Sequence, residues 1–359
     1  MTRNGAPAGQ PHGGAGQDRG GAEGLRGSAD PLTKAYDAAL LDLDGVVYLG
    51  GNAIPGVAMA LSEARGSGMQ LAFVTNNASR SPSAIAAQLT SLGIAATAAD
   101  VVTSAQAAAH LIADRLPAGA PVLVVGGIGL RLALRERGLR PVSTAAEKPS
   151  AVVQGYAPGV DYAMLAEGEL AVRAGAWFVA SNTDATLPTA RGLAPGNGSL
   201  VQVIVTATGQ QPVVAGKPQR PLHAEAVART GAKRPLVVGD RLDTDIEGAV
   251  NGGADSLLVL TGVSKPADVV LAAPRQRPTY LAADLSGLLE PHPDVSAQDG
   301  GFRCGGWSAR ADADSGQLEL SGDGVPIDGL RALCAAAWSV GEVTAKMVAP
   351  ALCQLNFPS

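Results

Sequence analysis

The chain is poor in aromatic residues and in charge, and it lacks long apolar runs and clusters of basic residues. Aromatic side chains are 3% of its 359 residues and charged ones 16%, so Ala, Val and Leu must fill the interior of a chain that is 46% apolar. The net charge is −5, and no Lys/Arg cluster offers the footprint of a nucleic-acid binder. No run approaches the roughly 18 apolar residues that span a membrane. We therefore expect no nucleic-acid partner and no membrane insertion.

Cysteine is also scarce, and its placement bears on the compartment. Cys304, Cys334 and Cys353 all lie near the C-terminal end, and none belongs to a C-x-x-C motif or has metal-ligand spacing. An odd number of cysteines without such a motif favours a reducing environment. The N-terminus has no apolar segment typical of a secretory signal. These features predict a cytoplasmic protein.

Beyond a Gly-rich start, strand-like and helix-like segments alternate. Residues 1–33, with nine Gly in the first thirty, lack periodicity and are predicted to be a disordered tail. Apolar runs at 37–42 and 70–75 read as buried strands, and 56–67 between them reads as a helix. Alternation of this kind predicts an α/β fold, a Rossmann-like doubly wound parallel sheet covered by helices on both faces.

The chain is too long for one core, and one interval indicates an inserted domain. About 140 residues separate Thr75, at the end of a predicted strand, from Lys217, and they contain their own strand-helix-strand pattern. We predict that this insertion is an α/β cap over the carboxyl edge of the main sheet, where ligands of open α/β sheets bind. The predicted parts are a core at 34–91 and 211–289, a cap at 92–210 and a small C-terminal α+β appendage at 290–359. The appendage is expected to pack on the rest of the chain or on a second copy, which would make a homodimer.

Two carboxylates stand close together after the first predicted strand. Asp42 and Asp44 follow an apolar run and precede Gly45. Like charges this close raise each other's pKa unless a cation or hydrogen bonds stabilise them, and a divalent metal would do so. An isolated Asp-x-Asp-Gly is more often a turn than a catalytic pair, so the rest of the chain has to decide.

Three further polar clusters follow predicted strands. The second is Thr75-Asn76-Asn77, the third is Gly216-Lys217-Pro218, and the fourth runs from Gly239 to Asp245. Within the fourth, Thr244 and Glu247 match a capping box, which would start a helix there. Because the carboxyl ends of parallel strands meet at one edge of a sheet, all four clusters are expected to converge.

The order of these clusters resembles the haloacid dehalogenase (HAD) superfamily of phosphatases. Asp-Leu-Asp-Gly-Val-Val-Tyr, Val-Thr-Asn-Asn-Ala-Ser, Gly-Lys-Pro and Val-Gly-Asp-Arg-Leu-Asp-Thr-Asp-Ile look like the NagD-type subfamily with a type II cap. That subfamily includes p-nitrophenyl phosphatases, pyridoxal phosphatases and glycerol-3-phosphate phosphatases. The resemblance covers about residues 34–288 and implies an enzyme that hydrolyses small phosphate monoesters.

The carboxylate pair suits this chemistry. Phosphate monoesters hydrolyse extremely slowly unaided, and a carboxylate nucleophile divides the reaction into two displacements through an aspartyl phosphate. We expect Asp42 to be that nucleophile. Asp44 would protonate the leaving oxygen and then take a proton from the attacking water.

The remaining site residues follow from their places in the series. By resemblance, Mg²⁺ is held by the Asp42 carboxylate, the Asp44 backbone carbonyl and the Asp240 carboxylate. Asp245 would lie behind these ligands and orient a metal-bound water or Lys217; Asp243 is a weaker candidate. Either acid could instead be a helix N-terminal residue that favours the macrodipole. The remaining expected roles are phosphate binding by Thr75, Asn76 and Asn77 and charge neutralisation by Lys217.

The loop after the apolar run 177–180 is the candidate for substrate selection. Asn182, Asp184 and Arg191 offer hydrogen bonds, and no aromatic residue lies between Phe178 and the end of the loop. A pyridine ring would favour an aromatic or His partner, so the loop fits glycerol 3-phosphate better than pyridoxal 5′-phosphate. The alternative is a polar loop that binds nothing.

Other functions stay open at this point. The enzyme could act on nucleotides or broadly on esters such as p-nitrophenyl phosphate. A catalytically dead scaffold would explain the fold but not the presence of every expected catalytic residue. Some actinobacterial relatives resemble the chain in carrying a C-terminal piece like part of an acetyltransferase, yet no acetyl-CoA pyrophosphate loop is evident here.

Overall fold

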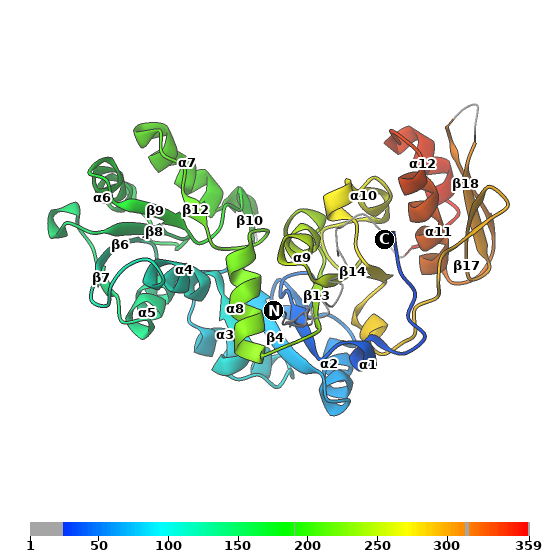
Figure 1. Ribbon diagram of the computed structural model, residues 1–359, viewed down its shortest axis with the longest axis horizontal. Coiled ribbons are helices and arrows are strands. Elements are labelled where there is room, and N and C mark those ends of the chain that lie inside the picture. Colours follow the sequence, from blue (N-terminus) through cyan, green and yellow to red (C-terminus); the bar gives the residue numbers. More distant parts are fainter. Residues whose placement is uncertain (1–23, 190, 313–315, 358–359) are drawn as a thin grey trace, which may run out of the picture.

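The computed structural model describes residues 24–189, 191–312 and 316–357. It arranges three units in a row, with the core in the middle, the inserted cap at one end and the C-terminal unit at the other (Figure 1). The α/β fold class with a parallel core sheet and an inserted cap is thus confirmed. None of the helices in these described ranges has the length and apolar composition that crossing a membrane requires.

The core is built on a six-stranded sheet in which all neighbours are parallel. β1 occupies a central position because its four residues are all apolar and buried. Side chains alternate across the sheet, so Ala39 and Leu41 face one layer and Leu40 faces the other. In spatial order the strands are β15 (Tyr280–Ala282), β14 (Asp255–Val259), β13 (Pro235–Gly239), β1 (Ala38–Leu41), β4 (Gln70–Thr75) and β5 (Val101–Thr103).

Helices cover both faces of this sheet. The first face carries α1 (Leu32–Ala35), α2 (Val57–Gly66) and α3 (Pro82–Ser91), and the second face carries α4 (Ser104–Ala113) and α8 (Arg220–Thr230). Ser81 begins α3 because its hydroxyl accepts a hydrogen bond from the Ala84 N–H group. The shorter core elements are β2 (Tyr48–Leu49), β3 (Asn52–Ala53), α9 (Glu247–Gly252) and α10 (Pro266–Val270).

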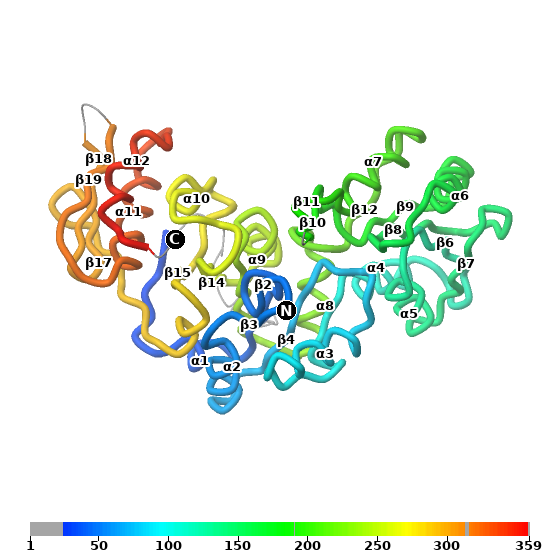
Figure 2. The backbone as a smooth tube through the Cα atoms, turned by 180° about the vertical axis from the view of Figure 1, so that it is seen from behind, coloured from blue at the N-terminus to red at the C-terminus, as the bar shows by residue number. Residues whose placement is uncertain are grey.

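The cap has a parallel sheet of its own. Its strands, in spatial order, are β12 (Val213–Val214), β9 (Trp177–Ala180), β8 (Ala151–Gln154), β6 (Pro121–Val125) and β7 (Arg140–Val142). Helices α6 (Tyr162–Arg173) and α7 (Asn197–Thr208) cover one face, and α5 (Ile128–Glu136) covers the other. The hairpin β10 (Thr186–Thr189) and β11 (Gly192–Pro195) lies on the side of the cap that faces the core (Figure 2).

The predicted cap boundaries differ from the observed ones at both ends. The prediction placed the cap at 92–210, but β5 and α4 belong to the core, and the cap sheet begins only with β6. At the other end β12 pairs with β9, so the cap continues to Val214. Helix α4 packs against both α8 of the core and α5 of the cap, so one apolar cluster runs through both units.

The C-terminal unit packs on the core. Its four-stranded antiparallel sheet is followed by two helices, and the apolar faces of both enclose one cluster with Leu258 and Leu281 of the core. The appendage therefore has its partner within the same chain. Its elements are β16 (Ser296–Gln298), β17 (Gly301–Cys304), β18 (Trp307–Ala311), β19 (Leu318–Gly322), α11 (Pro326–Ser339) and α12 (Ala345–Leu352).

The predicted disordered tail was too long. Residues 24–33, which the prediction included, are ordered: the Ser28 N–H group donates to the His292 carbonyl at 2.8 Å, and Leu25 is buried against the C-terminal unit. Through these contacts the N-terminal segment packs where the core meets the C-terminal unit. Residues 1–23 lie outside the described residues.

Candidate active site

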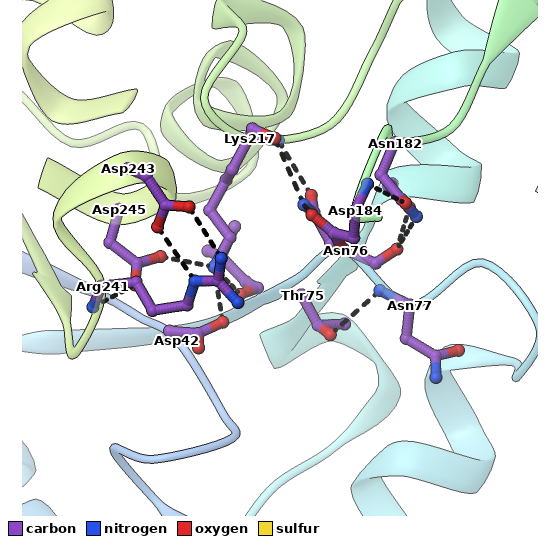
Figure 3. A network of polar contacts seen from close by, with 12 residues as sticks. Asp42, Thr75, Asn76, Asn77, Asn182, Asp184, Lys217, Arg241, Asp243 and Asp245 are labelled. Atoms are coloured by element: carbon purple, nitrogen blue, oxygen red, sulfur yellow. Dashed lines mark hydrogen bonds and ion pairs between the residues drawn. The ribbon is translucent and has the colours of Figure 1, made fainter. Parts of the chain in front are cut away.

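The four polar clusters converge at the carboxyl edge of the core sheet. β1 leads to Asp42 and β4 to Thr75 and Asn76, while Lys217 lies on the segment that returns from the cap (Figure 3). β13 leads to Asp240. The parallel order β13-β1-β4 brings the first three strand ends next to one another. This is the edge at which open α/β sheets bind ligands.

Lys217 joins two carboxylates at the centre of the site. Its Nζ donates to Asp42 Oδ1 at 2.5 Å, to Asp245 Oδ1 at 2.7 Å and to the Val74 carbonyl at 3.3 Å. The side chain is 4% exposed. Burial acts to lower the pKa of Lys217, but the carboxylates of Asp245 and Asp42 outweigh it and raise the pKa, so the ammonium stays charged.

Asp240 is fully buried, and only one of its two carboxylate oxygens has a hydrogen-bond partner among the described residues. Its Oδ2 accepts a hydrogen bond from the Val263 N–H group at 2.7 Å, whereas its Oδ1 has no partner among the described residues. The backbone at Gly45 and Gly262 touches this carboxylate so closely that a methyl group at either position would overlap with it. Gly45 also has a φ of 86°, which favours glycine. Both glycines therefore admit the carboxylate into the floor of the site.

The arrangement fits a divalent cation. Carboxylate oxygens of Asp42, Asp240 and Asp245 lie within 4.8 Å of one another. Burial raises the pKa of Asp42, and burial together with the Asp245 charge raises the pKa of Asp240 to about 6. Charge on these groups is therefore costly in the metal-free protein, and an oxygen-preferring cation such as Mg²⁺ relieves that cost. Asp245 already accepts from Lys217 and from the Arg241 N–H group, which suits a position behind the ligands.

Asp44 stands at the mouth of the site. Its side chain is exposed, and its backbone forms a β-bridge with Tyr48 of β2. Partial desolvation raises the pKa of Asp44 and outweighs the opposing effect of the Lys217 and Arg80 charges. A raised pKa favours the protonated form, which a general acid needs.

The polar residues after β4 form hydrogen bonds within the protein. Thr75 is buried, and its hydroxyl accepts from the Asn77 N–H group at 3.1 Å. Asn77 is exposed, and its Oδ1 accepts from the Ser79 and Arg80 N–H groups, which shapes the turn. The Asn76 amide bonds to the Lys217 backbone and to Asp184. Phosphate binding by either Asn stays a prediction, and the structure shows that Asn76 and the Asn77 Oδ1 also have partners within the protein.

The cap loop reaches the core at this point. Asn182 is buried, and its Nδ2 donates to the Asn76 carbonyl at 2.7 Å. Burial raises the pKa of Asp184, whose carboxylate accepts from the Asn76 amide. Arg191 lies at the turn of the β10–β11 hairpin with an exposed side chain. Asn182 and Asp184 therefore contact the carboxyl edge of the core sheet through Asn76, whereas Arg191 lies on the surface of the cap.

Asp243 pairs with its neighbour and does not join the carboxylate cluster. Arg241 Nε and Nη2 donate to its two oxygens at 3.0 and 2.7 Å, an arrangement visible in Figure 3. The hydrogen bonds to Arg241 lower the pKa of Asp243 in spite of partial burial. Its carboxylate is therefore occupied away from the predicted cation position.

The sequence prediction missed one side of the site. Thr261, Gly262 and Val263 follow β14, and the Thr261 hydroxyl donates to the Gly45 carbonyl at 2.5 Å. This segment supplies the backbone donor to Asp240. Its position at the carboxyl end of a strand next to β13 was the signal that could have found it.

Sequence comparisons agree with this geometry. A model described as haloacid dehalogenase-like hydrolase matches residues 39–140, and one described as HAD-hydrolase-like matches residues 214–288. D-glycerol 3-phosphate phosphatase of Mycobacterium tuberculosis is 48% identical over 315 residues, which are 86% of this chain and 87% of the relative. The chain belongs to the haloacid dehalogenase superfamily of hydrolases. Like its curated relatives, it is a phosphoric monoester hydrolase.

Two further similarities extend the comparison within the superfamily. The crystal structure of glycerol phosphate phosphatase from Mycobacterium tuberculosis in complex with magnesium covers 91% of this chain and 99% of its own, with 44% identity and a TM-score of 0.83. The 5′-nucleotidase YutF of Bacillus subtilis is 41% identical over 234 residues, 65% of this chain and 90% of its own length. A GCN5-related N-acetyltransferase-like model matches residues 304–355, within the C-terminal unit of this HAD hydrolase.

Proposed function

We propose that this HAD hydrolase is a Mg²⁺-dependent phosphatase that converts glycerol 3-phosphate to glycerol and phosphate. The observation that carries the substrate is the similarity to D-glycerol 3-phosphate phosphatase, which extends over 86% of the chain. A cap loop without aromatic residues agrees with a small polyol.

The chain's own residues supply each step. The Asp42 carboxylate attacks phosphorus, and the alkoxide leaves with a proton from Asp44. Asp44 then takes a proton from the water that attacks the aspartyl phosphate, and the Asp42 carboxylate is regenerated with release of phosphate. Lys217 offsets charge on Asp42 and on the phosphoryl oxygens. Asp42, the Asp44 carbonyl and Asp240 would hold Mg²⁺, which neutralises charge on the transferring phosphoryl group.

The test is a comparison of kcat/KM for glycerol 3-phosphate, pyridoxal 5′-phosphate, nucleoside 5′-monophosphates and p-nitrophenyl phosphate. We expect glycerol 3-phosphate to exceed the others by at least tenfold, no turnover with Asp42→Asn and restoration by Mg²⁺ after EDTA treatment. Equal values would indicate a generalist, and a preference for nucleotides would place the chain functionally with the 5′-nucleotidase. Wild-type turnover by Asp42→Asn would refute the mechanism.

We also propose a cytoplasmic location and keep the homodimer as a prediction. All three cysteines are free, and Cys304 and Cys334 are buried, which agrees with a reducing compartment. Light scattering on the purified protein decides the oligomeric state. A monomeric mass would contradict the dimer.

A further inference from the structure

Asn76 holds the backbone of Lys217 from both sides. Its Oδ1 accepts from the Lys217 N–H group at 2.8 Å, and its Nδ2 donates to the Lys217 carbonyl at 3.2 Å. The second hydrogen of Nδ2 faces the Asp184 carboxylate, at 3.2 and 3.3 Å from its two oxygens. The donors of this amide are thus used within the protein (Figure 3).

The two partners of the amide fix its orientation. A backbone N–H group can only donate, so Oδ1 must face Lys217; a carboxylate can only accept, so Nδ2 must face Asp184. Each contact therefore favours the same rotamer. Asp184 belongs to the cap loop, whereas Asn76 belongs to the core, so the cap reinforces the orientation that the Lys217 N–H group selects.

Lys217 needs such an anchor because of its place in the chain. Only Ala215 and Gly216 separate it from β12, the last strand of the cap sheet. A Cβ atom on Gly216 would collide with the Ser181 carbonyl and with Asn76 Oδ1, which shows how closely cap and core approach here. Cap movement would shift Lys217 and its ammonium unless a core residue held the backbone.

We propose that Asn76 is the positioning residue of Lys217 and that Asp184 of the cap locks Asn76 in the orientation this requires. The position of the lysine that contacts Asp42 is then coupled to the position of the cap loop. This inference deepens the proposed phosphatase function and rests on it. It replaces the direct phosphate contact expected of Asn76 from the sequence.

Steady-state kinetics separate the two roles. Asn76→Ala should lower kcat for p-nitrophenyl phosphate by at least tenfold, since a displacement of about 1 Å at a reacting group costs on the order of 10²-fold. The inhibition constant of inorganic phosphate should change by a smaller factor. A tenfold weaker phosphate inhibition with kcat near the wild-type value would mean that Asn76 binds phosphate and would overturn the proposal.

Ser104→Ala is the matched control. The Ser104 hydroxyl donates to the Asn76 carbonyl at 2.7 Å, so this variant loosens the same loop without touching the amide. We expect a lower Tm and a kcat within threefold of wild type. A loss of kcat equal to that of Asn76→Ala would show that general support of the loop, rather than the amide, matters.

Exchanging the acid and the amide separates the two parts of the proposal, the contact between cap and core and the support of the Lys217 backbone. Asn76→Asp combined with Asp184→Asn restores the contact between cap and core, yet a carboxylate cannot donate to the Lys217 carbonyl. The double variant should regain Tm relative to Asn76→Asp while kcat stays low. Full recovery of kcat would overturn the positioning role.

The lysine ammonium can also be observed without turnover. Lys217 is the one buried lysine among six, so ¹⁵N-labelled lysine should give one slowly exchanging ammonium signal, absent in Lys217→Arg. Asn76→Ala should shift or broaden this signal, and Ser104→Ala should leave it in place. An unchanged signal in Asn76→Ala would contradict the proposal even if the wild-type protein proved not to be a phosphatase.

Discussion

Replacement of Asp240 by Asn should stabilise the metal-free protein while abolishing its response to Mg²⁺. The carboxylate is fully buried, and its pKa is raised to about 6, mainly by burial. A rise of about two units corresponds to about 3 kcal/mol of unfavourable charge at neutral pH. An imperfectly paired amide in its place costs about 1–2 kcal/mol. The net gain is about 1–2 kcal/mol, a Tm increase of roughly 1–3 °C for a chain of this length.

The pH dependence of this destabilisation follows from the ionisation of Asp240 in the folded and in the unfolded chain. Below about pH 4 the Asp240 carboxyl is protonated in both the folded and the unfolded chain, so it carries no penalty. Between about pH 4 and 6 the unfolded chain alone ionises, and the penalty on the folded state grows. Above about pH 6 the penalty is complete. The Tm advantage of Asp240→Asn should therefore appear over this interval and then stay constant.

Thermal unfolding in EDTA and in Mg²⁺ provides the assay. Ligand at about 100 times its Kd stabilises by about 2.7 kcal/mol, so Mg²⁺ should restore the wild-type Tm above that of the variant. Asp243→Asn makes the same chemical change at an exposed ion pair with Arg241 and should raise Tm in neither condition. A lower Tm for Asp240→Asn in EDTA, or an equal Mg²⁺ response in both proteins, would refute the reasoning.

Three further predictions concern single contacts. His223 of α8 is buried, with its Nδ1 at 3.0 Å from the Gly248 carbonyl. Burial lowers the pKa of His223 to about 4, so acid should destabilise the protein as the pH falls from about 6.5 to 4. A plot of Tm against pH for His223→Gln should lack this loss, which amounts to up to about 3 kcal/mol. A methyl group at position 262 would crowd Asp240, so Gly262→Ala should eliminate the increase of Tm that Mg²⁺ produces. Mg²⁺ binding at the wild-type level, measured by calorimetry on this variant, would contradict the prediction. Arg331 bonds to the Leu281 carbonyl and to Asp328, so Arg331→Met should cost roughly 3 kcal/mol and leave kcat within twofold; a large kcat change would tie the C-terminal unit to catalysis.

The position of the site was predictable because its elements obey a strong rule. The runs before Asp42, Thr75 and Asp240 are apolar enough to be buried strands, and parallel strands place their carboxyl ends along one edge. Lys217 could be added only because of its place in the series of motifs. The convergence of these groups therefore followed from the sequence, whereas the atoms they contact did not.

Short elements account for the errors in the fold. β5 has three residues, too few for its apolar pattern to identify it as a core strand, so the cap was predicted to begin early. The capping box expected at Thr244 is absent, because residues Leu242–Ile246 form a π-helical turn that leads into α9. That turn directs Asp245 towards Lys217. Contacts with a distant segment thus outweigh the local signal.

Side-chain amides were the least predictable part of the site. Asn76 carries the same donors and acceptor whether it binds a phosphate oxygen or a peptide group, so its type and position could not distinguish the two. The contacts that the amide makes within the protein involve Lys217 and Asp184, which are 141 and 108 residues away. Only the folded contact between cap and core provides them.

The short link between β12 and Lys217 limits how the cap can be exchanged during evolution or protein engineering. The cap resembles a removable module, yet its last strand and the lysine that contacts Asp42 are separated by only Ala215 and Gly216. If a foreign cap were joined to the host core after Lys217, the host would receive the lysine and its neighbours from the foreign protein. Exchange of substrate ranges between relatives should therefore preserve the host sequence from Ala215 onward and retain a residue equivalent to Asn76.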